Sequence, residues 1–204
     1  MEYNFDSVEY EKRKRIINSG YAEFSEFGIA RASLNKILSN SGVSKGFFYH
    51  YFKDKDSFYQ YLIEHGITLV VEKLNDKSLL DEQDFISRLQ KASMYKTELL
   101  ITFPKLMDFF TKFYSDSSPE VYEEVSLRLG GDFAYRLRTE NIDFSLFRDD
   151  ISIENAMKII SRYMAQIVSE VTSMIPKISY KEISEYYIKE LEVIRDAIYK
   201  KGEQ

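Results

Sequence analysis

Residues 33–55 read SLNKILSNSGVSKGFFYHYFKDK, a pattern of two short helices joined by a turn. Ser33 can cap the first helix and Ser44 the second, because a serine oxygen accepts the free amide hydrogens of a first helical turn. The turn between them, residues 40–42, is Asn-Ser-Gly, whose residue types favour tight turns. Two short helices joined in this way allow the second one to enter the major groove of DNA. The stretch therefore predicts a helix-turn-helix.

The second of these helices is expected to have one inward and one outward face. Phe48 and Phe52 are four residues apart and would face inward against Ile37. The outward residues would be Lys45, Gly46, Tyr49 and His50. On such a face lysine supplies a cation, tyrosine supplies a hydroxyl for a phosphate, and glycine lets the backbone come close to DNA. Lys55 is expected to begin the next helix, where its ammonium group and the free amides of the first turn can bind one phosphate.

Charge is unevenly distributed around this stretch. Residues 12–55 contain nine Lys or Arg and three Asp or Glu, a net charge of +6. Because the whole chain carries -5, all other residues together carry -11. A basic segment on an acidic chain favours contact with phosphates in one orientation. Charge alone leaves open the alternative of a chance fluctuation on a solvated surface.

Helical signals continue along the rest of the chain. Apolar residues recur at helical spacing over residues 8–27, and Gly28 is expected to end that helix. Later helix starts are expected at Asp54, Asp81, Ser118 and Ser179. Eight glycines and three prolines in 204 residues leave little support for hairpins. The predicted fold class is all-α, with an N-terminal three-helix helix-turn-helix domain followed by a helical domain.

Two segments near the C-terminus have the most regular apolar spacing in the chain. They begin at Ile153 and Ile183, and their apolar residues recur every three or four positions. We expect a homodimer interface along them, at Ile153, Met157, Ile160, Met164, Ile167, Val171, Tyr187, Leu191, Ile194 and Ile198. The first segment also carries a second apolar set, Ala156, Ile159 and Tyr163, so one of its faces should meet something other than its own core. Packing within a single chain is the alternative.

Aromatic residues crowd the middle of the sequence. They are Tyr95, Phe103, Phe109, Phe110, Phe113, Tyr114, Tyr122, Phe133 and Tyr135. Such residues suit a pocket for a flat or apolar small molecule, but they equally suit an ordinary core. No individual ligand-binding residue is assigned, and the expected effector is apolar or aromatic.

Residues 43–58, VSKGFFYHYFKDKDSF, resemble the signature of the tetracycline-repressor (TetR) family of bacterial regulators. The resemblance runs from about Arg13 through Tyr61, about a quarter of the chain. The matching positions are Phe27, Gly28, Ser33, Ile37, Gly42, Val43, Ser44, Lys45, Gly46, Tyr49, Phe52, Lys53, Lys55 and Phe58. A set of this many matching positions in the same order is specific evidence for the family, whereas a glycine turn alone would be weak evidence.

The resemblance implies a DNA-binding domain in residues 1–55 and a helical effector-binding and dimerisation domain in residues 56–204. It implies DNA contacts from Ser44, Lys45, Gly46, Phe47, Tyr49, His50 and Lys55, with Ser33 and Asn35 near the flanking backbone. The implied function is a ligand-responsive transcriptional regulator, with repression as the expected mode. It would bind a palindromic operator in double-stranded DNA as a homodimer and be released by a small-molecule effector.

Three positions depart from the family pattern or stay ambiguous. Leu34 stands where many members have a phosphate-binding threonine, so Asn35 or Lys36 is expected to take that contact. Phe47 replaces a residue that is more commonly small or polar. Its ring can touch a thymine methyl, or it can pack on a neighbouring protein side chain. Tyr51 is open between DNA contact and packing.

Other classes of protein find less support. The chain has no cysteine and two histidines, and no phosphate-binding loop, metal-ligand spacing or nucleophile motif occurs, so neither an enzyme nor a cofactor or metal is expected. No apolar run approaches a bilayer span, so no membrane contact and a cytoplasmic location are expected. The alternative function is a helical protein-binding adaptor that does not bind DNA.

Overall fold

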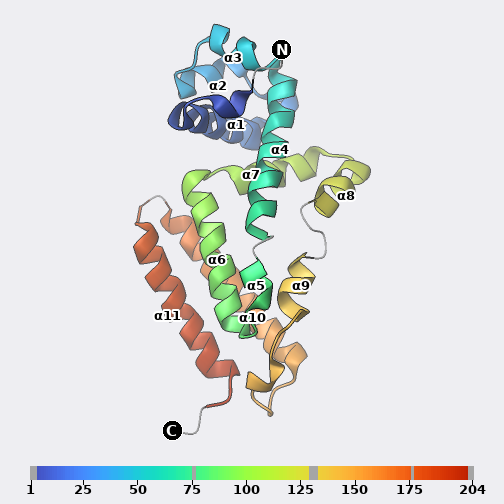
Figure 1. The fold of residues 1–204 in the computed structure, drawn as a ribbon, viewed down its shortest axis with the longest axis vertical. Coiled ribbons are helices and arrows are strands. Elements are labelled where there is room, and N and C mark those ends of the chain that lie inside the picture. The colour runs from blue at the N-terminus through green and yellow to red at the C-terminus, as the bar shows by residue number, and fades with distance from the viewer. Residues whose placement is uncertain (1–3, 75–76, 129–132, 176, 202–204) are drawn as a thin grey trace. The chain divides into compact units, whose positions relative to one another are not determined.

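The computed structural model describes residues 4–74, 77–128, 133–175 and 177–201 (Figure 1). The helices are η1 (Phe5–Ser7), α1 (Tyr10–Arg31), α2 (Leu34–Ser41), α3 (Lys45–Tyr51), α4 (Lys55–Leu74), α5 (Lys77–Asp81), α6 (Phe85–Thr102), α7 (Leu106–Asp116), α8 (Pro119–Arg128), α9 (Phe133–Thr139), η2 (Phe144–Leu146), α10 (Ile153–Met174) and α11 (Tyr180–Ile198). Within these ranges the β pairing is limited to an isolated bridge between Phe147 and Tyr199. The all-α prediction is confirmed. None of the described helices is both long enough and apolar enough to cross a membrane.

The helices pack into two compact units. Unit 1 holds residues 1–72 and 102–131, and unit 2 holds residues 73–101 and 132–204. The chain passes between the units near the C-terminal ends of α4 and α6. Unit 1 thus combines the helix-turn-helix with α7 and α8, a grouping that the sequence did not indicate. The domain boundary between residues 55 and 56 stays a prediction.

The core of unit 1 forms where α1 packs against α2 and α7. Tyr21 and Phe24 of α1 are fully buried, and their ring centroids lie 5.0 and 6.5 Å from that of Phe109 on α7. Phe58 and Leu62 of α4 complete this core and are also fully buried. The first helices are therefore held by aromatic side chains from α7.

This packing bears on the aromatic residues of the middle segments. The members buried in unit 1 are Phe103, Phe109, Phe110 and Phe113. They pack on one another and on α1 and α4, so the core interpretation accounts for these four. Tyr122 and Tyr135 are exposed, and the side chain of Phe133 lies outside the described residues.

Two glycines shape unit 1 through their positive φ angles. Gly42 has φ 67° and ends α2 in a left-handed cap, where a residue with a Cβ atom would be strained. Gly28 has φ 64° and interrupts α1, which was expected to end there. Helical hydrogen bonding resumes after it and continues to Arg31, because the amide of Ala32 still donates to the carbonyl of Gly28 at 3.1 Å. The interruption is therefore at the predicted residue, Gly28, but α1 continues beyond its predicted end to Arg31.

Most predicted helix starts are confirmed by their caps. Ser33, Ser44 and Asp54 accept amide hydrogens from the first turns of α2, α3 and α4. Ser179 and Glu182 form a reciprocal capping box on α11. The start expected at Asp81 is wrong. Asp81 ends α5, and α6 is capped by Asp84, whose carboxylate accepts the Ser87 amide at 2.9 Å.

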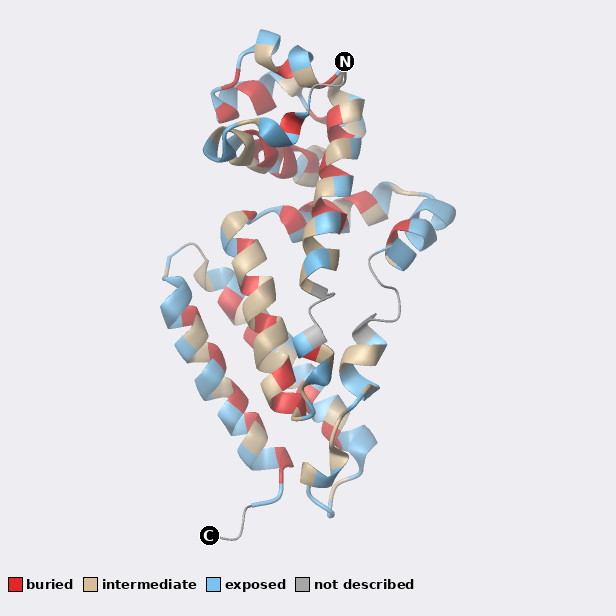
Figure 2. Ribbon diagram, viewed as in Figure 1, coloured by how far each residue is buried: buried red, intermediate tan, exposed pale blue. Residues whose placement is uncertain are grey.

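The core of unit 2 is formed by α6, α10, α11 and the segment around Phe147. Figure 2 shows buried and exposed residues alternating along α11. Seven of the ten residues expected at a dimer interface are buried in this core: Ile160, Ile167, Val171, Tyr187, Leu191, Ile194 and Ile198. Met157 and Met164 are partly buried against it, and Ile153 is exposed. Packing within the chain, the alternative left open by the sequence, accounts for the buried seven, because their side chains have no surface to offer a partner.

Candidate nucleic-acid interface

The recognition segment consists of α2, the turn at Gly42, and α3. Phe48 is fully buried and Phe52 is 6% exposed, as expected for the inward face of α3. Phe48 packs on Phe58 of α4 with a centroid distance of 5.6 Å, so α3 is anchored to unit 1 by its inner side. Tyr49, on the other side, is 55% exposed. The predicted division of α3 into an inward and an outward face is confirmed.

The outward face of α3 carries polar and small residues. Its exposed members are Lys45, Gly46, Tyr49 and His50. A Cβ atom added to Gly46 would meet no other atom within 4 Å, so the protein itself has no steric need for glycine at that position. Within the part of the chain that the structure describes, no ion pair involves Lys36, Lys45 or Lys53. Lys45 on the outward face of α3 can therefore bind an anion without breaking an ion pair within the protein.

Two serines at the helix starts already have structural roles. The Ser33 hydroxyl oxygen accepts the Lys36 amide at 3.4 Å, and the Ser44 oxygen accepts the Phe47 amide at 3.2 Å. The backbone amide of Ser33 donates to the buried Glu23 carboxylate at 2.8 Å, which fixes the start of α2. A hydroxyl that accepts a capping bond keeps its own proton, and that proton can donate to a phosphate oxygen. Asn35 and Lys36 are exposed on α2.

Lys55 has a role that sequence reasoning missed. Its ammonium group donates to the backbone carbonyls of Ile29 and Ala32 at 2.6 and 3.0 Å. These carbonyls belong to the end of α1, so Lys55 joins the start of α4 to the turn that leads into α2. The ammonium group has three hydrogens, and at least two are directed at the protein. Bracing the helix-turn-helix is thus its observed role, and its phosphate contact stays a prediction.

Phe47 and Tyr51 are partly buried in a stack of side chains (the α3 stack: Phe5, Phe47, Tyr51 and Lys12). The Phe47 ring lies 5.0 Å from the Tyr51 ring, and the ammonium group of Lys12 lies 3.7 Å from the Phe47 centroid. The Tyr51 ring contacts Phe5 of η1 at 5.3 Å. Packing on protein is therefore observed for Phe47 and Tyr51, and base contact stays a prediction for both.

Sequence reasoning missed Phe5 and Lys12 in this stack. Lys12 was counted only as part of the basic segment, although an ammonium group binds readily over an aromatic ring. Phe5 precedes the first helical periodicity and carries no spacing signal. Asn4, whose side chain accepts the Asp6 amide at 2.9 Å, is a cap that could have indicated an ordered turn there.

The second histidine belongs to the core of unit 1. The Tyr21 hydroxyl donates to the Leu62 carbonyl at 3.1 Å and lies 2.8 Å from His65 Nδ1. Which of these two groups donates the hydrogen depends on the tautomer of the His65 ring. Burial, assisted by the charge of Arg13, lowers the pKa of His65 to about 4.

Residues 16–62 match the family model described as bacterial regulatory proteins, tetR family. Residues 16–62 are thus a helix-turn-helix of the TetR family. The matched residues include α2, α3 and the first part of α4, so the family assignment rests on the segment whose geometry is described above. The family is non-enzymatic, which agrees with the expectation that this protein is not an enzyme.

Two curated relatives match the chain over part of its length. The uncharacterised HTH-type transcriptional regulator YerO of Bacillus subtilis (strain 168) is 33% identical over 66 residues, which cover 32% of this chain and 23% of YerO. The HTH-type transcriptional regulator BetI of Serratia proteamaculans (strain 568) is 34% identical over 74 residues, which cover 33% of this chain and 37% of BetI. The matches thus span well under half the length of either relative.

Solved structures resemble the chain over nearly its whole length. A TetR family transcriptional regulator from Chloroflexus aurantiacus J-10-fl has a TM-score of 0.60 at 21% identity, with 97% of each chain covered. The transcriptional regulator FadR from Bacillus subtilis, in complex with stearoyl-CoA, has a TM-score of 0.53 at 18% identity, with 91% of this chain and 98% of FadR covered. At these identities the likeness shows a shared fold.

Proposed function

We propose that this TetR-family protein is a transcriptional regulator that binds operator DNA through α3, acts as a homodimer in the cytoplasm and responds to a small-molecule effector. The observation that carries the proposal is the outward face of α3, where Lys45, Gly46 and Tyr49 are exposed while Phe48 and Phe52 fix the helix from within. A cation, a phenol hydroxyl and an approachable backbone on one short helix suit a DNA groove and its phosphates.

Binding to DNA upstream of the protein's own gene tests the proposal directly. In an electrophoretic mobility assay the protein is expected to shift this DNA at low salt. The affinity should fall as the salt concentration rises, because phosphate contacts release counterions. Lys45→Ala should weaken binding to every sequence and reduce the salt slope by about one. Lys181→Ala is the matched control, since that side chain is 85% exposed on α11 in unit 2. Absence of a mobility shift at low salt would favour the alternative function, a helical protein-binding adaptor that does not bind DNA.

Lys55→Ala separates the two roles of that lysine. If Lys55 contacts a phosphate, the variant loses affinity and about one unit of salt slope while its melting temperature stays close to that of the wild type. If Lys55 only braces α1 and α4, the melting temperature falls and the salt slope is unchanged, because a lysine that binds two carbonyls contributes to folding rather than to charge.

Phe47→Ala separates base readout from packing. Apolar readout of a thymine methyl predicts a relaxed preference at one base pair with an unchanged salt slope. Packing against Lys12 and Tyr51 predicts an equal loss of affinity across all sequences, because the whole recognition helix would loosen. A panel of operator variants with single base changes provides the measurement.

Homodimer formation is proposed through the outer faces of α10 and α11, since their inner faces are occupied. The Tyr163 hydroxyl of α10 donates to Glu190 of α11 at 2.6 Å. Ile159 precedes Tyr163 by four residues and Val193 follows Glu190 by three, so helical spacing puts both next to this hydrogen bond. Their exposed fractions are 47% and 50%. A short recognition helix needs a second copy to select a genomic site, which favours a near-palindromic operator.

Charge placed on that face tests the interface. Ile159→Glu combined with Val193→Glu should convert the dimer to a monomer in sedimentation and weaken binding to a palindrome. Ile188→Glu is the matched control, because Ile188 is 44% exposed on a different side of α11. A dimer that survives the double substitution would place the interface elsewhere.

Effector control is proposed through α4, which begins next to α3 at Lys55 and ends in unit 2. The FadR complex supports a small molecule as the signal, because that regulator of similar fold holds stearoyl-CoA. To weaken operator binding a hundredfold, an effector must favour the released state by about 2.7 kcal/mol. The coupling is reciprocal, so operator DNA should weaken effector binding by the same factor. Equal effector affinities with and without operator would contradict this route.

A further inference from the structure

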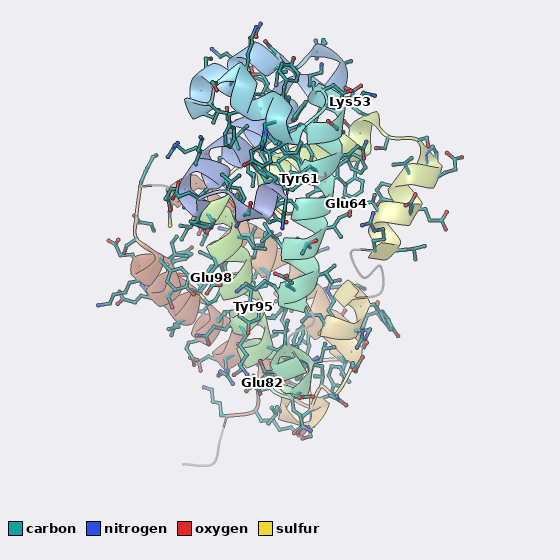
Figure 3. The ribbon with its side chains drawn as sticks, turned by 45° about the horizontal axis from the view of Figure 1, so that its top comes forward. Lys53, Tyr61, Glu64, Glu82, Tyr95 and Glu98 are labelled. Atoms are coloured by element: carbon teal, nitrogen blue, oxygen red, sulfur yellow. The ribbon has the colours of Figure 1, made fainter. Side chains whose placement is uncertain are left out.

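Unit 2 contains a hollow of about 380 Å³ beside α6, formed by residues outside the candidate nucleic-acid interface. Met94, Tyr95 and Glu98 of α6 line it together with Tyr180, the first residue of α11. Figure 3 shows Tyr95 and Glu98 on α6, where a spacing of three residues puts them side by side. Glu82 and Lys91 line it as well, so the hollow combines two carboxylates and an ammonium group with two aromatic rings and a thioether.

A cation from the chain itself, the Lys73 ammonium group, contacts two of these residues, although Lys73 does not itself line the hollow. The Lys73 ammonium group donates to Glu98 Oε2 at 2.8 Å and lies 5.1 Å from the centroid of the Tyr95 ring. The Tyr180 hydroxyl donates to the other carboxylate oxygen, Oε1, at 3.4 Å. The hydrogen bond to Glu98 raises the pKa of Lys73, which shows that the surroundings favour a positive charge. An ammonium group held between a carboxylate and the face of an aromatic ring has the contacts that proteins use for organic cations.

The resident lysine can be replaced at little cost. The side chains of Lys73 and Glu98 are 40% and 44% exposed, and ion pairs with such exposure contribute little to stability. A free organic cation that carries an aromatic ring would gain the same carboxylate and ring contacts and would also cover Met94 and Tyr180. The other carboxylate of the hollow, Glu82, is paired with Lys91 at 2.8 Å.

We propose that Tyr95, Glu98 and Tyr180 form a binding site for an aromatic ammonium compound, which replaces the Lys73 ammonium group when it binds. Lys73 is the penultimate residue of α4, so its release changes how the end of that helix is held within unit 2. The inference deepens the proposed function, because it names the chemical class of the effector and rests on that function for its link to DNA. The binding step itself is independent of DNA.

Calorimetric titration of the full chain with benzyltrimethylammonium chloride tests the binding step. Saturable binding at one site is expected, and benzyl alcohol, which keeps the ring without the charge, should give at least tenfold weaker binding. Glu98→Gln should lower the affinity at least tenfold, and Lys73→Met should raise it severalfold because the competing ammonium group is removed. Glu82→Gln is the matched control and should leave the affinity within about twofold.

The variants are expected to keep the fold, since the substituted side chains are partly exposed, and circular dichroism melting verifies this. No binding of the probe to either the wild type or Lys73→Met, or equal affinities of wild type and Glu98→Gln, would overturn the proposal. Operator binding is measured in separate titrations. Binding of the probe without binding of DNA would support the cation site and contradict the proposed function. Binding of DNA without binding of the probe would support the proposed function and contradict the cation site.

Discussion

At the scale of single residues, Gly46 separates the needs of the fold from those of DNA. A Cβ atom there would meet nothing in the protein, and alanine favours helix over glycine by up to about 1 kcal/mol. We expect Gly46→Ala to keep or raise the melting temperature while it weakens DNA binding about tenfold or more, because the added methyl group would lie on the face that we propose meets the groove. Thermal melting and anisotropy titrations measure the two effects.

Gly42→Ala should behave in the opposite way. Gly42 has φ 67°, so alanine there strains the turn and should lower the stability by about 1 kcal/mol. The apparent DNA affinity should then fall only in proportion to the fraction of protein that is unfolded. If Gly46→Ala binds DNA as tightly as the wild type, the backbone of α3 does not approach the groove closely.

His65 should make the stability of unit 1 depend on pH. Burial lowers its pKa to about 4 in the folded protein, against about 6.5 in an unfolded chain. The unfolded state therefore binds a proton more readily, and the free energy of unfolding should fall by about 3 kcal/mol as the pH falls from 6.5 to 4. This contribution is complete above pH 6.5 and is lost below it.

Comparison of the wild type with His65→Gln and His50→Gln separates the effect of His65 on stability from the effect of carboxylate titration. Denaturant unfolding at pH 7 and pH 4.5 should show a smaller loss for His65→Gln than for the wild type. His50→Gln, on the exposed face of α3, should keep the loss seen in the wild type. Equal losses in wild type and His65→Gln would show that the ring does not stay neutral in the fold.

At the scale of secondary-structure elements, Arg88 holds two helix ends in unit 2. The side chain is fully buried on α6. Its guanidinium group donates to the carbonyls of Leu80 in α5 and Glu82 just after it, and to those of Leu137 in α9 and Glu140 just after it. Burial lowers the pKa of Arg88, while the charges of Glu140, Glu82 and Asp81 oppose that shift and the carbonyls at the two helix ends accept its hydrogens.

Removal of this guanidinium group should loosen α5 and α9 together. We expect Arg88→Met to lower the free energy of unfolding by about 3 kcal/mol or more, because several buried carbonyls lose their donors at once. Lys158→Met is the control, since its ion pair with Glu154 is exposed and should contribute under about 0.5 kcal/mol. Hydrogen exchange should show faster exchange in α5 and α9 for Arg88→Met, and unchanged rates there would contradict the clamp.

Elements that are specified locally could be predicted from the sequence. The caps at Ser33, Ser44 and Asp54 and the turn at Gly42 depend on neighbours within a few residues, and they appear as expected. Asp81 failed as a start because the competing Asp84 lies three residues further on and caps α6 instead.

Interactions between distant segments could not be predicted from local patterns. The Arg88 clamp joins residues about fifty positions apart, and Lys55 reaches carbonyls more than twenty positions away. The same limit applies to the candidate site, where the outward face of α3 followed from helical spacing but the packing of Phe47 on Lys12 did not. The apolar periodicity of α10 and α11 correctly indicated buried faces, but periodicity carries no information on whether the burying surface is the same chain or another.

At the scale of the whole molecule, the uneven charge should govern how the protein meets DNA. Residues 12–55 carry +6 and all other residues together carry -11. The basic segment should attract DNA while the rest repels it, which favours approach with α3 leading. The association rate with a short duplex should therefore fall steeply with salt, and stopped-flow measurements at two salt concentrations would show it.

The grouping of residues 102–131 with residues 1–72 has a consequence for the exchange of parts between regulators. A DNA-binding head cut at residue 72 would lose α7 and expose Tyr21 and Phe24, whose rings pack on Phe109. Such a fragment should bind a hydrophobic dye and melt without cooperativity, whereas addition of residues 102–128 through a linker should restore a cooperative transition. Chimaeras that graft this head onto a foreign sensor should therefore work only when the graft carries α7 along with the first four helices.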